Sequence, residues 1–248
     1  MSGRTGRRGA AVRPTTAGRG PTSRLRAAIG ALTVALAAGA AVALPAAPAE
    51  AAGGNGGPGG NGGKVVYLTF DDGPSPAYTP KILATLARYG VRATFFEIGR
   101  NVATHPALTT QVAREGHSVQ NHSWSHPDLR KLSGPALDAQ LSDTDRIIRA
   151  RTGRTPSCLR PPYGAVNGAV RSRAAALGKQ VVLWSVDPAD WSRPGAAAIR
   201  SRVLNNVRPG SVILLHDGGG DRSQTVAALP GIISALKARG YGFATLCG

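Results

Sequence analysis

Two pairs of side chains in this sequence have the types and the spacing of a metal site. Asp71 and Asp72 are adjacent carboxylates at the end of an apolar run, and they repel each other unless a cation or an arginine lies nearby. His122 and His126 are four residues apart, a spacing at which a helical turn points both imidazoles the same way. Taken singly, the two aspartates are compatible with a helix cap before Gly-Pro. The two histidines alone are compatible with a spacing that arises by chance. Together, Asp72 and the histidines make a carboxylate-imidazole set with one open coordination position, as a hydrolytic zinc site requires.

Three more polar motifs lie at the ends of apolar stretches. Residues 160–164 read Arg-Pro-Pro-Tyr-Gly, in which the prolines stiffen a turn and fix where the arginine and the tyrosine backbone point. Residues 187–191 read Asp-Pro-Ala-Asp-Trp, and residues 214–217 read Leu-Leu-His-Asp. Each motif alone is compatible with a structural turn, a capping aspartate or a buried histidine. Five such motifs in one domain favour a single functional site.

The elements that must position these motifs alternate between short apolar strands and longer helical patterns. The predicted strands are 64–70, 93–99, 118–121, 157–159, 180–186, 211–216 and 241–246, and the predicted helices are 79–90, 107–115, 135–152, 167–178, 195–207 and 225–239. Strands that are apolar on both faces and separated by helices predict a parallel α/β sheet. Polar motifs at the ends of many different strands favour a barrel over an open sheet. No glycine-rich phosphate loop follows the first strand, which argues against dinucleotide binding.

The N-terminal part of the sequence has the composition of an export signal. Residues 1–26 hold seven arginines and no acid, residues 27–44 are apolar, and Ala49-Glu50-Ala51 is a small-x-small site. We therefore expect a signal peptide over 1–51. A membrane anchor is the alternative, but the apolar stretch has few leucines and a proline-containing segment follows it directly. A twin-arginine signal at Arg7-Arg8 lies far from the apolar run.

A flexible linker and one folded domain are expected after the signal peptide. Residues 52–63 are almost entirely glycine, asparagine and proline and cannot bury a core. The remaining residues 64–248 have the size of one domain. We expect this mature protein to be secreted, without a stable membrane span, and monomeric.

The net charge of +17 suggests a nucleic-acid-binding protein only until its distribution is considered. Removing residues 1–51 takes away seven positive charges and one negative charge and leaves +11. The remaining arginines are dispersed, without the basic and aromatic interleaving of a nucleic-acid platform. We expect no nucleic-acid partner and a basic surface that suits association with an anionic cell wall.

The two cysteines, Cys158 and Cys247, both lie in the predicted exported domain. Two cysteines in an oxidising compartment most simply pair, and we predict a disulfide between them. A thiolate metal site is the alternative, but neither cysteine has a partner at CxxC spacing.

In their order, the five motifs resemble a known family. TFDDG, HSWSH, RPPYG, DPADW and ILLH are similar to the signature motifs of the polysaccharide deacetylases related to nodulation-factor chitooligosaccharide deacetylase, or carbohydrate esterase family four. The resemblance spans essentially all of residues 64–248. It implies a distorted (β/α) barrel and hydrolysis of acetyl groups from N-acetylated or O-acetylated polysaccharides.

The resemblance and the chemistry together suggest how the metal side of the site would work. Asp72, His122 and His126 would hold a divalent metal, zinc or alternatively cobalt, with water in the open position, where zinc can lower the pKa of the water to ~7. By similarity, Asp71 is the general base, and Arg160 keeps it ionised and aimed. The attacking species would then form at neutral pH.

The remaining motif residues would complete the reaction and shape the pocket. His216 is the expected general acid for the departing amine, and Asp190 would orient its imidazole and raise its pKa. The backbone N–H of Tyr163 would help to stabilise the tetrahedral oxyanion. Trp191 and Leu214 would line a small pocket for the acetyl methyl group.

Three functional hypotheses remain open on the sequence alone. The first is a secreted deacetylase acting on an N-acetylglucosamine polymer, either chitin oligosaccharide or peptidoglycan. The second is an acetylxylan esterase, which would share every catalytic residue. The third is an inactive carbohydrate-binding module. The presence of the predicted acid, base and metal ligands argues against the third.

Overall fold

The described part of the chain is an α/β domain. A computed structural model describes residues 63–248. The predicted signal peptide and all but the last residue of the predicted linker lie outside the described residues. Within residues 63–248, no helix is long and apolar enough to cross a membrane.

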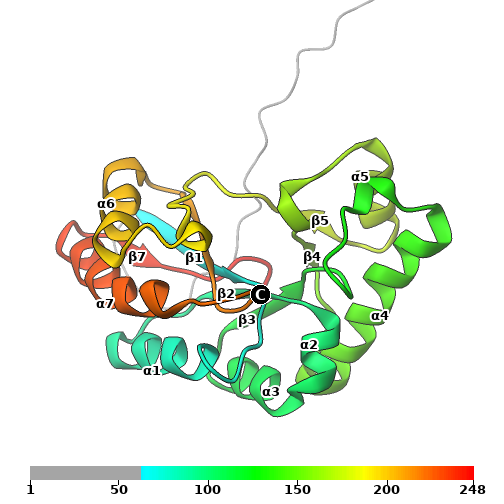
Figure 1. Ribbon diagram of the computed structural model, residues 1–248, viewed down its shortest axis with the longest axis horizontal. Coiled ribbons are helices and arrows are strands. Elements are labelled where there is room, and N and C mark those ends of the chain that lie inside the picture. The colour runs from blue at the N-terminus through cyan, green and yellow to red at the C-terminus, as the bar shows by residue number, and fades with distance from the viewer. Residues whose placement is uncertain (1–62) are drawn as a thin grey trace, which may run out of the picture. The chain divides into compact units, whose positions relative to one another are not determined.

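Parallel strands form the centre of the domain (Figure 1). Their order is β5-β4-β3-β2-β1-β6, and β7 pairs with the beginning of β1. The strands are β1 (Val65–Asp71), β2 (Thr94–Glu97), β3 (Ser118–Asn121), β4 (Cys158–Leu159), β5 (Gln180–Val181), β6 (Val212–His216) and β7 (Gly242–Phe243). This curled parallel sheet is the distorted (β/α) barrel that the sequence predicts.

The predicted strand 180–186 is wrong as a single element, and the reason explains how the sheet curls. Only Gln180 and Val181 pair with β4. Further along, the Ser185 N–H donates to the Val212 carbonyl, and Val186 bridges to Ile213 of β6. The segment thus leaves one edge of the sheet and joins the other, so its apolar residues belong to two pairings.

The helices pack around the sheet, with α1, α2 and α3 along one side, α6 and α7 at one end and α4 and α5 at the other (Figure 1). They are α1 (Thr79–Tyr89), α2 (Gly99–Thr104), α3 (Pro106–Arg114), α4 (Gly134–Thr152), α5 (Gly168–Ala176), α6 (Ala196–Asn206) and α7 (Ser223–Ala238). The sequence pattern predicts all of these except α2, which is only six residues long. In α1, the glycine predicted to end the helix, Gly90, is its left-handed C-cap.

The core lies between β1 and the helices. Val66, Leu68 and Phe70 of β1 are fully buried, as is Leu215 of β6. Burying an aliphatic or aromatic side chain of this size contributes roughly 1.5–3 kcal/mol. The packed interior therefore fixes the strands whose carboxyl ends carry the polar motifs.

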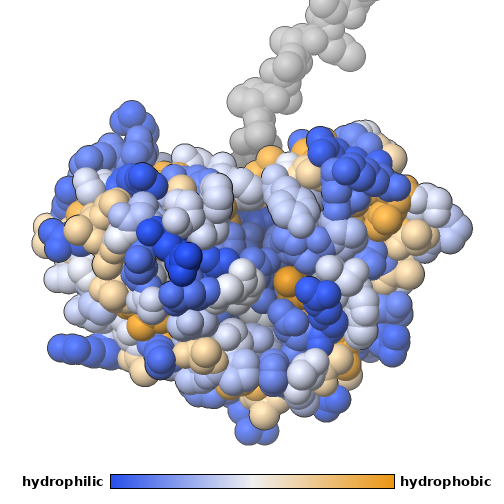
Figure 2. Space-filling model, in the orientation of Figure 1, coloured by the Kyte–Doolittle hydropathy of each residue, from blue (hydrophilic) through white to orange (hydrophobic). Residues whose placement is uncertain are grey.

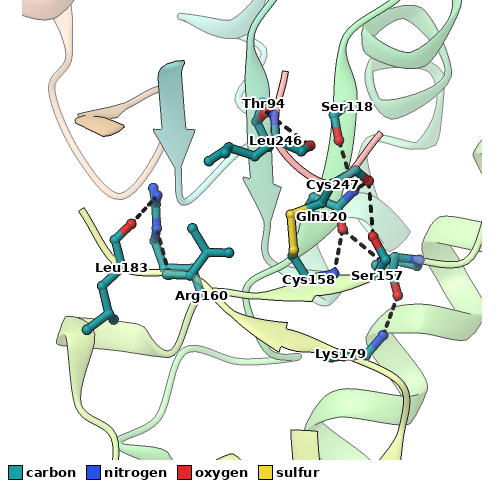
Figure 3. Close-up of a disulfide and its surroundings, with 12 residues drawn as sticks. Thr94, Ser118, Gln120, Ser157, Cys158, Arg160, Lys179, Leu183, Leu246 and Cys247 are labelled. Carbon is teal, nitrogen blue, oxygen red and sulfur yellow. Dashed lines mark hydrogen bonds between the residues drawn. A yellow bond between two sulfur atoms is a disulfide. The ribbon is translucent and has the colours of Figure 1, made fainter. Parts of the chain in front are cut away.

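The structure contains the predicted disulfide between Cys158 and Cys247 (Figure 3). Cys158 lies in β4, and the Gln120 side chain forms hydrogen bonds with the backbone of both cysteines. Its Nε2 donates to the Cys247 carbonyl, and its Oε1 accepts from the Cys158 N–H. The Leu246 N–H also donates to Thr94 Oγ1 at 2.8 Å. The cross-link thus holds the last residues against β2, β3 and β4.

We expect replacement of both cysteines by serine to lower the melting temperature without unfolding the active cavity. The two cysteines are 89 residues apart, and closing a loop of that length stabilises a fold by about 4–5 kcal/mol in the chain-entropy model. Thermal unfolding followed by circular dichroism measures the loss. A double variant that melts at the wild-type temperature would contradict a stabilising role.

Candidate metal and catalytic site

Asp72, His122 and His126 come together at the carboxyl ends of β1 and β3. One potential ligand atom from each lies within 4.8 Å of the others. The Nε2 of His126 is 3.2 Å from Asp72 Oδ1, and the Nε2 of His122 is 3.5 Å from the same oxygen. The structure therefore gathers the three side chains that the sequence selects as metal ligands.

The expectation of a helical turn at 122–126 is wrong. The segment is an irregular loop after β3, in which Ser123 and His126 have positive φ values of 66° and 62°. Two left-handed residues reverse the chain twice, and the imidazoles converge without a helix. Their ring centroids are 5.0 Å apart.

The donor set fits a divalent cation with a preference for nitrogen and oxygen ligands. Asp72 Oδ1 is buried and makes no hydrogen bond within the described residues. His122 Nδ1 lies 2.6 Å from the Arg160 carbonyl, which can only accept, so Nδ1 carries a proton and Nε2 is the ring nitrogen left for a cation. Burial alone would raise the pKa of Asp72, but His122, His216 and His126 lower it below its usual range. Asp72 is thus an ionised acceptor without a donor, as a cation ligand should be.

Asp71 faces the same cavity and is held by a buried arginine. Arg160 Nη1 donates to Asp71 Oδ1 at 2.8 Å and to Thr69 Oγ1 at 2.7 Å. The Arg160 side chain is completely buried, and its guanidinium lies 4.1 Å from the ring centroid of Phe96. Trp184 lies on the same guanidinium at 5.8 Å. The arginine, fixed in this way, is hydrogen-bonded to Oδ1 of Asp71. The other oxygen, Oδ2, lies 3.8 Å from His122 Nε2.

His216 is paired with a buried carboxylate. Its Nδ1 lies 2.7 Å from Asp190 Oδ1, and its backbone N–H donates to Asp190 Oδ2. Thr225 Oγ1 also donates to Oδ2. Burial alone would lower the pKa of His216, but the hydrogen bond with Asp190 and the charges of Asp190, Asp71 and Asp72 raise it above its ordinary value. Since Nδ1 is occupied, Nε2 is the nitrogen left for substrate.

The strand register explains why base and acid meet. In the β1–β6 pair, Asp71 lies beside His216, and Thr69 lies beside Leu214. Residues paired in a parallel ladder share a face, and positions two apart point the same way. The end of this one strand pair therefore supplies the predicted base, the predicted acid and a wall of the cavity.

A cavity of about 650 Å³ joins these groups. As whole residues, Tyr163 and Trp191 are 70% and 56% exposed, and Leu214 is almost fully buried. The lining residues are Asp71, Asp72, Ile98, Arg100, His122, His126, Tyr163, Trp184, Asp187, Trp191, Leu214, His216, Gly219 and Arg222. Around the hollow visible in Figure 2, the surface is mostly hydrophilic, with small dispersed apolar spots. A cavity that combines charged groups with aromatic and aliphatic walls suits a ligand that has both polar and apolar faces.

Several residues of the site are not singled out by the sequence. Thr69 could have been found, because it stands two residues before Asp71 on a strand and must point the same way. Trp184 and Thr225 reach Arg160 and Asp190 only through the tertiary fold. Arg222 donates to the carbonyls of Gly218 and Gly219 and braces the loop beside Asp72.

Gly219 is the residue of that loop at which an added Cβ would meet the Asp72 carboxylate, a proposed metal ligand. Its φ is +71°, and a Cβ placed there would lie 2.3 Å from Asp72 Oδ2. We expect Gly219→Ala to displace the Asp72 carboxylate and to lower metal affinity by about 10–100-fold. Titration of the metal-free protein with zinc measures the change. Gly220→Ala is the matched control, since its φ is also positive but its Cβ would meet only Arg222, beyond 3.5 Å.

Fold and site together fit one class of protein: a hydrolase whose cavity combines a candidate cation site, a carboxylate and a carboxylate-supported histidine at the ends of a parallel barrel. A model of the family described as polysaccharide deacetylase matches residues 59–182. The chain belongs to the polysaccharide deacetylase family and is an enzyme of the deacetylase class.

Individual relatives agree with this assignment. The chain is 44% identical over 185 residues to a peptidoglycan-N-acetylglucosamine deacetylase of Bacillus cereus, covering 74% of this chain and 86% of the relative. It is 43% identical over 192 residues to a chitooligosaccharide deacetylase of Rhizobium leguminosarum bv. trifolii, covering 73% and 89%. The crystal structure of the Bc1960 peptidoglycan N-acetylglucosamine deacetylase with 4-naphthalen-1-yl-N-oxidanyl-benzamide superposes with a TM-score of 0.72 at 41% identity, covering 73% and 86%.

Proposed function

We propose that this protein is a secreted, metal-dependent enzyme that removes N-acetyl groups from a polysaccharide containing N-acetylglucosamine. The observation that carries the proposal is the convergence of three groups on one cavity: the Asp72-His122-His126 set, the Asp71-Arg160 pair and the His216-Asp190 pair. Relatives named as deacetylases of peptidoglycan and of chitooligosaccharide support the substrate class.

Asp72, His122 and His126 would hold the cation, with zinc proposed and cobalt as the alternative. When bound, such a cation acts as a Lewis acid toward a carbonyl oxygen and lowers the pKa of water. Zinc binds imidazole through an unprotonated ring nitrogen, and His122 would use Nε2 because its Nδ1 faces the Arg160 carbonyl. Asp72 would bind as the ionised carboxylate.

Residues of the chain itself would accept and donate the protons of the reaction. Asp71 takes a proton from the water whose oxygen attacks the acetyl carbon, and Arg160 keeps that carboxylate oriented. His216 gives a proton to the nitrogen as the carbon–nitrogen bond breaks, so that acetate and a free amine leave. The Tyr163 N–H is proposed to stabilise the oxyanion of the tetrahedral intermediate. Trp191 and Leu214 would enclose the acetyl methyl group.

The pairing of His216 with Asp190 predicts a pH dependence. The imidazole must be protonated to act as the acid, so kcat should fall as the pH rises through its raised pKa. We expect Asp190→Asn to remove the main raising contribution and to move this alkaline limb to lower pH, with a loss of about tenfold for each pH unit of displacement. The pH profile of kcat measures the shift. Thr225→Val keeps the carboxylate and should move the limb less; an unchanged limb in Asp190→Asn would contradict the assignment.

The polymer itself is tested by measuring acetate release side by side on chitooligosaccharides, peptidoglycan and acetylxylan. The exposed rings of Tyr163 and Trp191 at the cavity suit stacking on sugar rings. Release from the N-acetylated polymers supports the proposal. Release only from acetylxylan would make the protein an O-deacetylase on the same scaffold, and release from none would favour the binding module.

Location and assembly form a separate part of the proposal. The arginine-rich and apolar composition of residues 1–51 supports export, and the positive charge of the remainder supports retention at an anionic wall. The mass of the protein recovered outside the cell should correspond to a chain that begins near residue 52. Size-exclusion chromatography should give a monomer.

A further inference from the structure

A buried ion pair outside the cavity is connected to the proposed metal ligands through one asparagine. Lys179 Nζ lies 2.5 Å from Asp145 Oδ2, and the lysine side chain is fully buried. Neither residue lines the cavity. We propose that Asp145 and Lys179 are positioning residues that, through Asn121, fix the turn carrying His122 and His126 before any metal binds. The inference rests on the proposed function of these two histidines as metal ligands.

Asn121 is the centre of the connection and has no free hydrogen-bonding group. It is fully buried as the last residue of β3. Its Nδ2 donates to the Leu141 carbonyl at 2.8 Å and to Asp145 Oδ1 at 2.7 Å, both on α4. Its Oδ1 accepts from the Ser123 N–H at 2.8 Å. One side chain thus joins the long helix to the metal-ligand turn.

The acceptors on α4 determine which way the Asn121 amide faces. An asparagine amide is nearly symmetric in shape and can turn over if its partners allow it. The Leu141 carbonyl and an ionised Asp145 can only accept, so they require Nδ2 on their side and leave Oδ1 toward Ser123. Lys179 compensates the Asp145 charge, and a second contact of its ammonium, to the Pro156 carbonyl at 2.6 Å, anchors it.

The turn depends on the bond that Oδ1 accepts. Ser123 is buried with φ at 66°, a region that costs a residue with a side chain about 1–2 kcal/mol. Its Oγ accepts from the His126 N–H at 3.1 Å, and His126 is itself left-handed. Gln140, also on α4, accepts from the backbone N–H groups of Trp124 and Ser125. Asn121 Oδ1, Ser123 Oγ and Gln140 Oε1 therefore hold the backbone N–H groups of the strained turn, and Asn121 provides the first of these acceptors.

An ion pair that is merely structural can be replaced by apolar residues with little effect, which makes a selective test available. The double variant Asp145→Leu/Lys179→Met removes both charges together, so no buried charge is left without a partner. It also removes one of the two acceptors that orient Asn121. The matched control is Asp138→Leu/Arg173→Met, which removes another ion pair between α4 and the residues that follow, without contact to the turn.

The readout is the dissociation constant for Zn²⁺ or Co²⁺ alone, measured by chelator competition, with the melting temperature of each metal-free protein. We expect the Asp145/Lys179 variant to bind metal about 10-fold more weakly, with an altered Co²⁺ absorption spectrum. The control variant should bind within twofold of wild type at a similar melting temperature. Wild-type affinity in the Asp145/Lys179 variant would overturn the inference and leave the proposed function intact, whereas a wild-type protein that binds no metal would overturn both.

A second measurement needs no variant and decides the case if the double variant fails to fold. Amide hydrogen exchange of the metal-free wild-type protein should show Ser123 and His126 as strongly protected as the strand residue Val119. Protection that arises only after metal is added would mean that the metal, and not the Asn121 connection, orders the turn. That result would overturn the inference.

Discussion

Replacing Asp71 with asparagine should leave the metal in place and lower the rate of acetate release by about 10²–10⁴-fold. Asparagine has nearly the same shape as aspartate and keeps an oxygen for Arg160, but it cannot take a proton from water. The ligand set Asp72, His122 and His126 does not include the exchanged side chain. Acetate release and bound zinc, measured on the same preparation, separate the two functions.

The Asp71→Asn variant should also be less stable, and this effect must be kept apart from the loss of turnover. Arg160 is completely buried and would lose its carboxylate partner, a change that typically costs 3–5 kcal/mol. Its remaining acceptors, Thr69 Oγ1 and the Leu183 carbonyl, and its stacking on Phe96 reduce the cost. Activity should therefore be assayed well below the melting temperature of the variant. If zinc content falls in parallel with activity, the roles assigned to Asp71 and Asp72 are wrong.

The sequence alone predicts much of this site because its chemistry is local to strand ends. Asp71 and Asp72 follow an apolar run, and His216 closes another, so the alternation of strands and helices is enough to bring them to one edge of the sheet. The sequence also selects two histidines that the structure brings together, although the reason is wrong. Spacing suggests a helical turn, but the chain brings the rings together through two left-handed residues.

The groups that support the site could not be predicted, because they are remote in the chain. Lys179 reaches Asp145 and Trp184 reaches Arg160 across more than twenty residues, and no periodic pattern encodes such contacts. The burial of two further acids, Glu97 and Asp217, is also not evident from the sequence pattern. Burial raises the pKa of Glu97 to about 8 and that of Asp217 to about 7. The segment 180–186 illustrates the same limit for the fold, since its hydrophobicity indicates burial but not a change of partner strand.

Removing the metal should lower acetate release to background and should also make the protein easier to melt. Asp72 Oδ1 is buried and has no hydrogen-bond partner within the described residues, so a bound ion would give that oxygen a favourable partner. With metal at about 1,000 times its dissociation constant, binding adds about 4 kcal/mol to stability, which corresponds to a rise in melting temperature of about 10 °C. Dialysis against a chelator, followed by titration with Zn²⁺, Co²⁺ or Mg²⁺, measures both effects. Zinc and cobalt should restore activity, whereas magnesium should not, because two of the three ligands are imidazoles.

Two single variants distinguish the loss of the metal from the loss of the proposed acid. His126→Ala removes a metal ligand, and we expect it to lose both acetate release and most of the stabilisation by zinc. His216→Ala removes the proposed acid, whose Nδ1 is bound to Asp190, and we expect it to lose acetate release while zinc still raises its melting temperature. Because the two histidines line the same cavity, a general disturbance of the pocket would affect both readouts in both variants. Full activity in rigorously metal-free wild-type protein would exclude a catalytic metal, and zinc stabilisation that survives in His126→Ala would place the ion elsewhere.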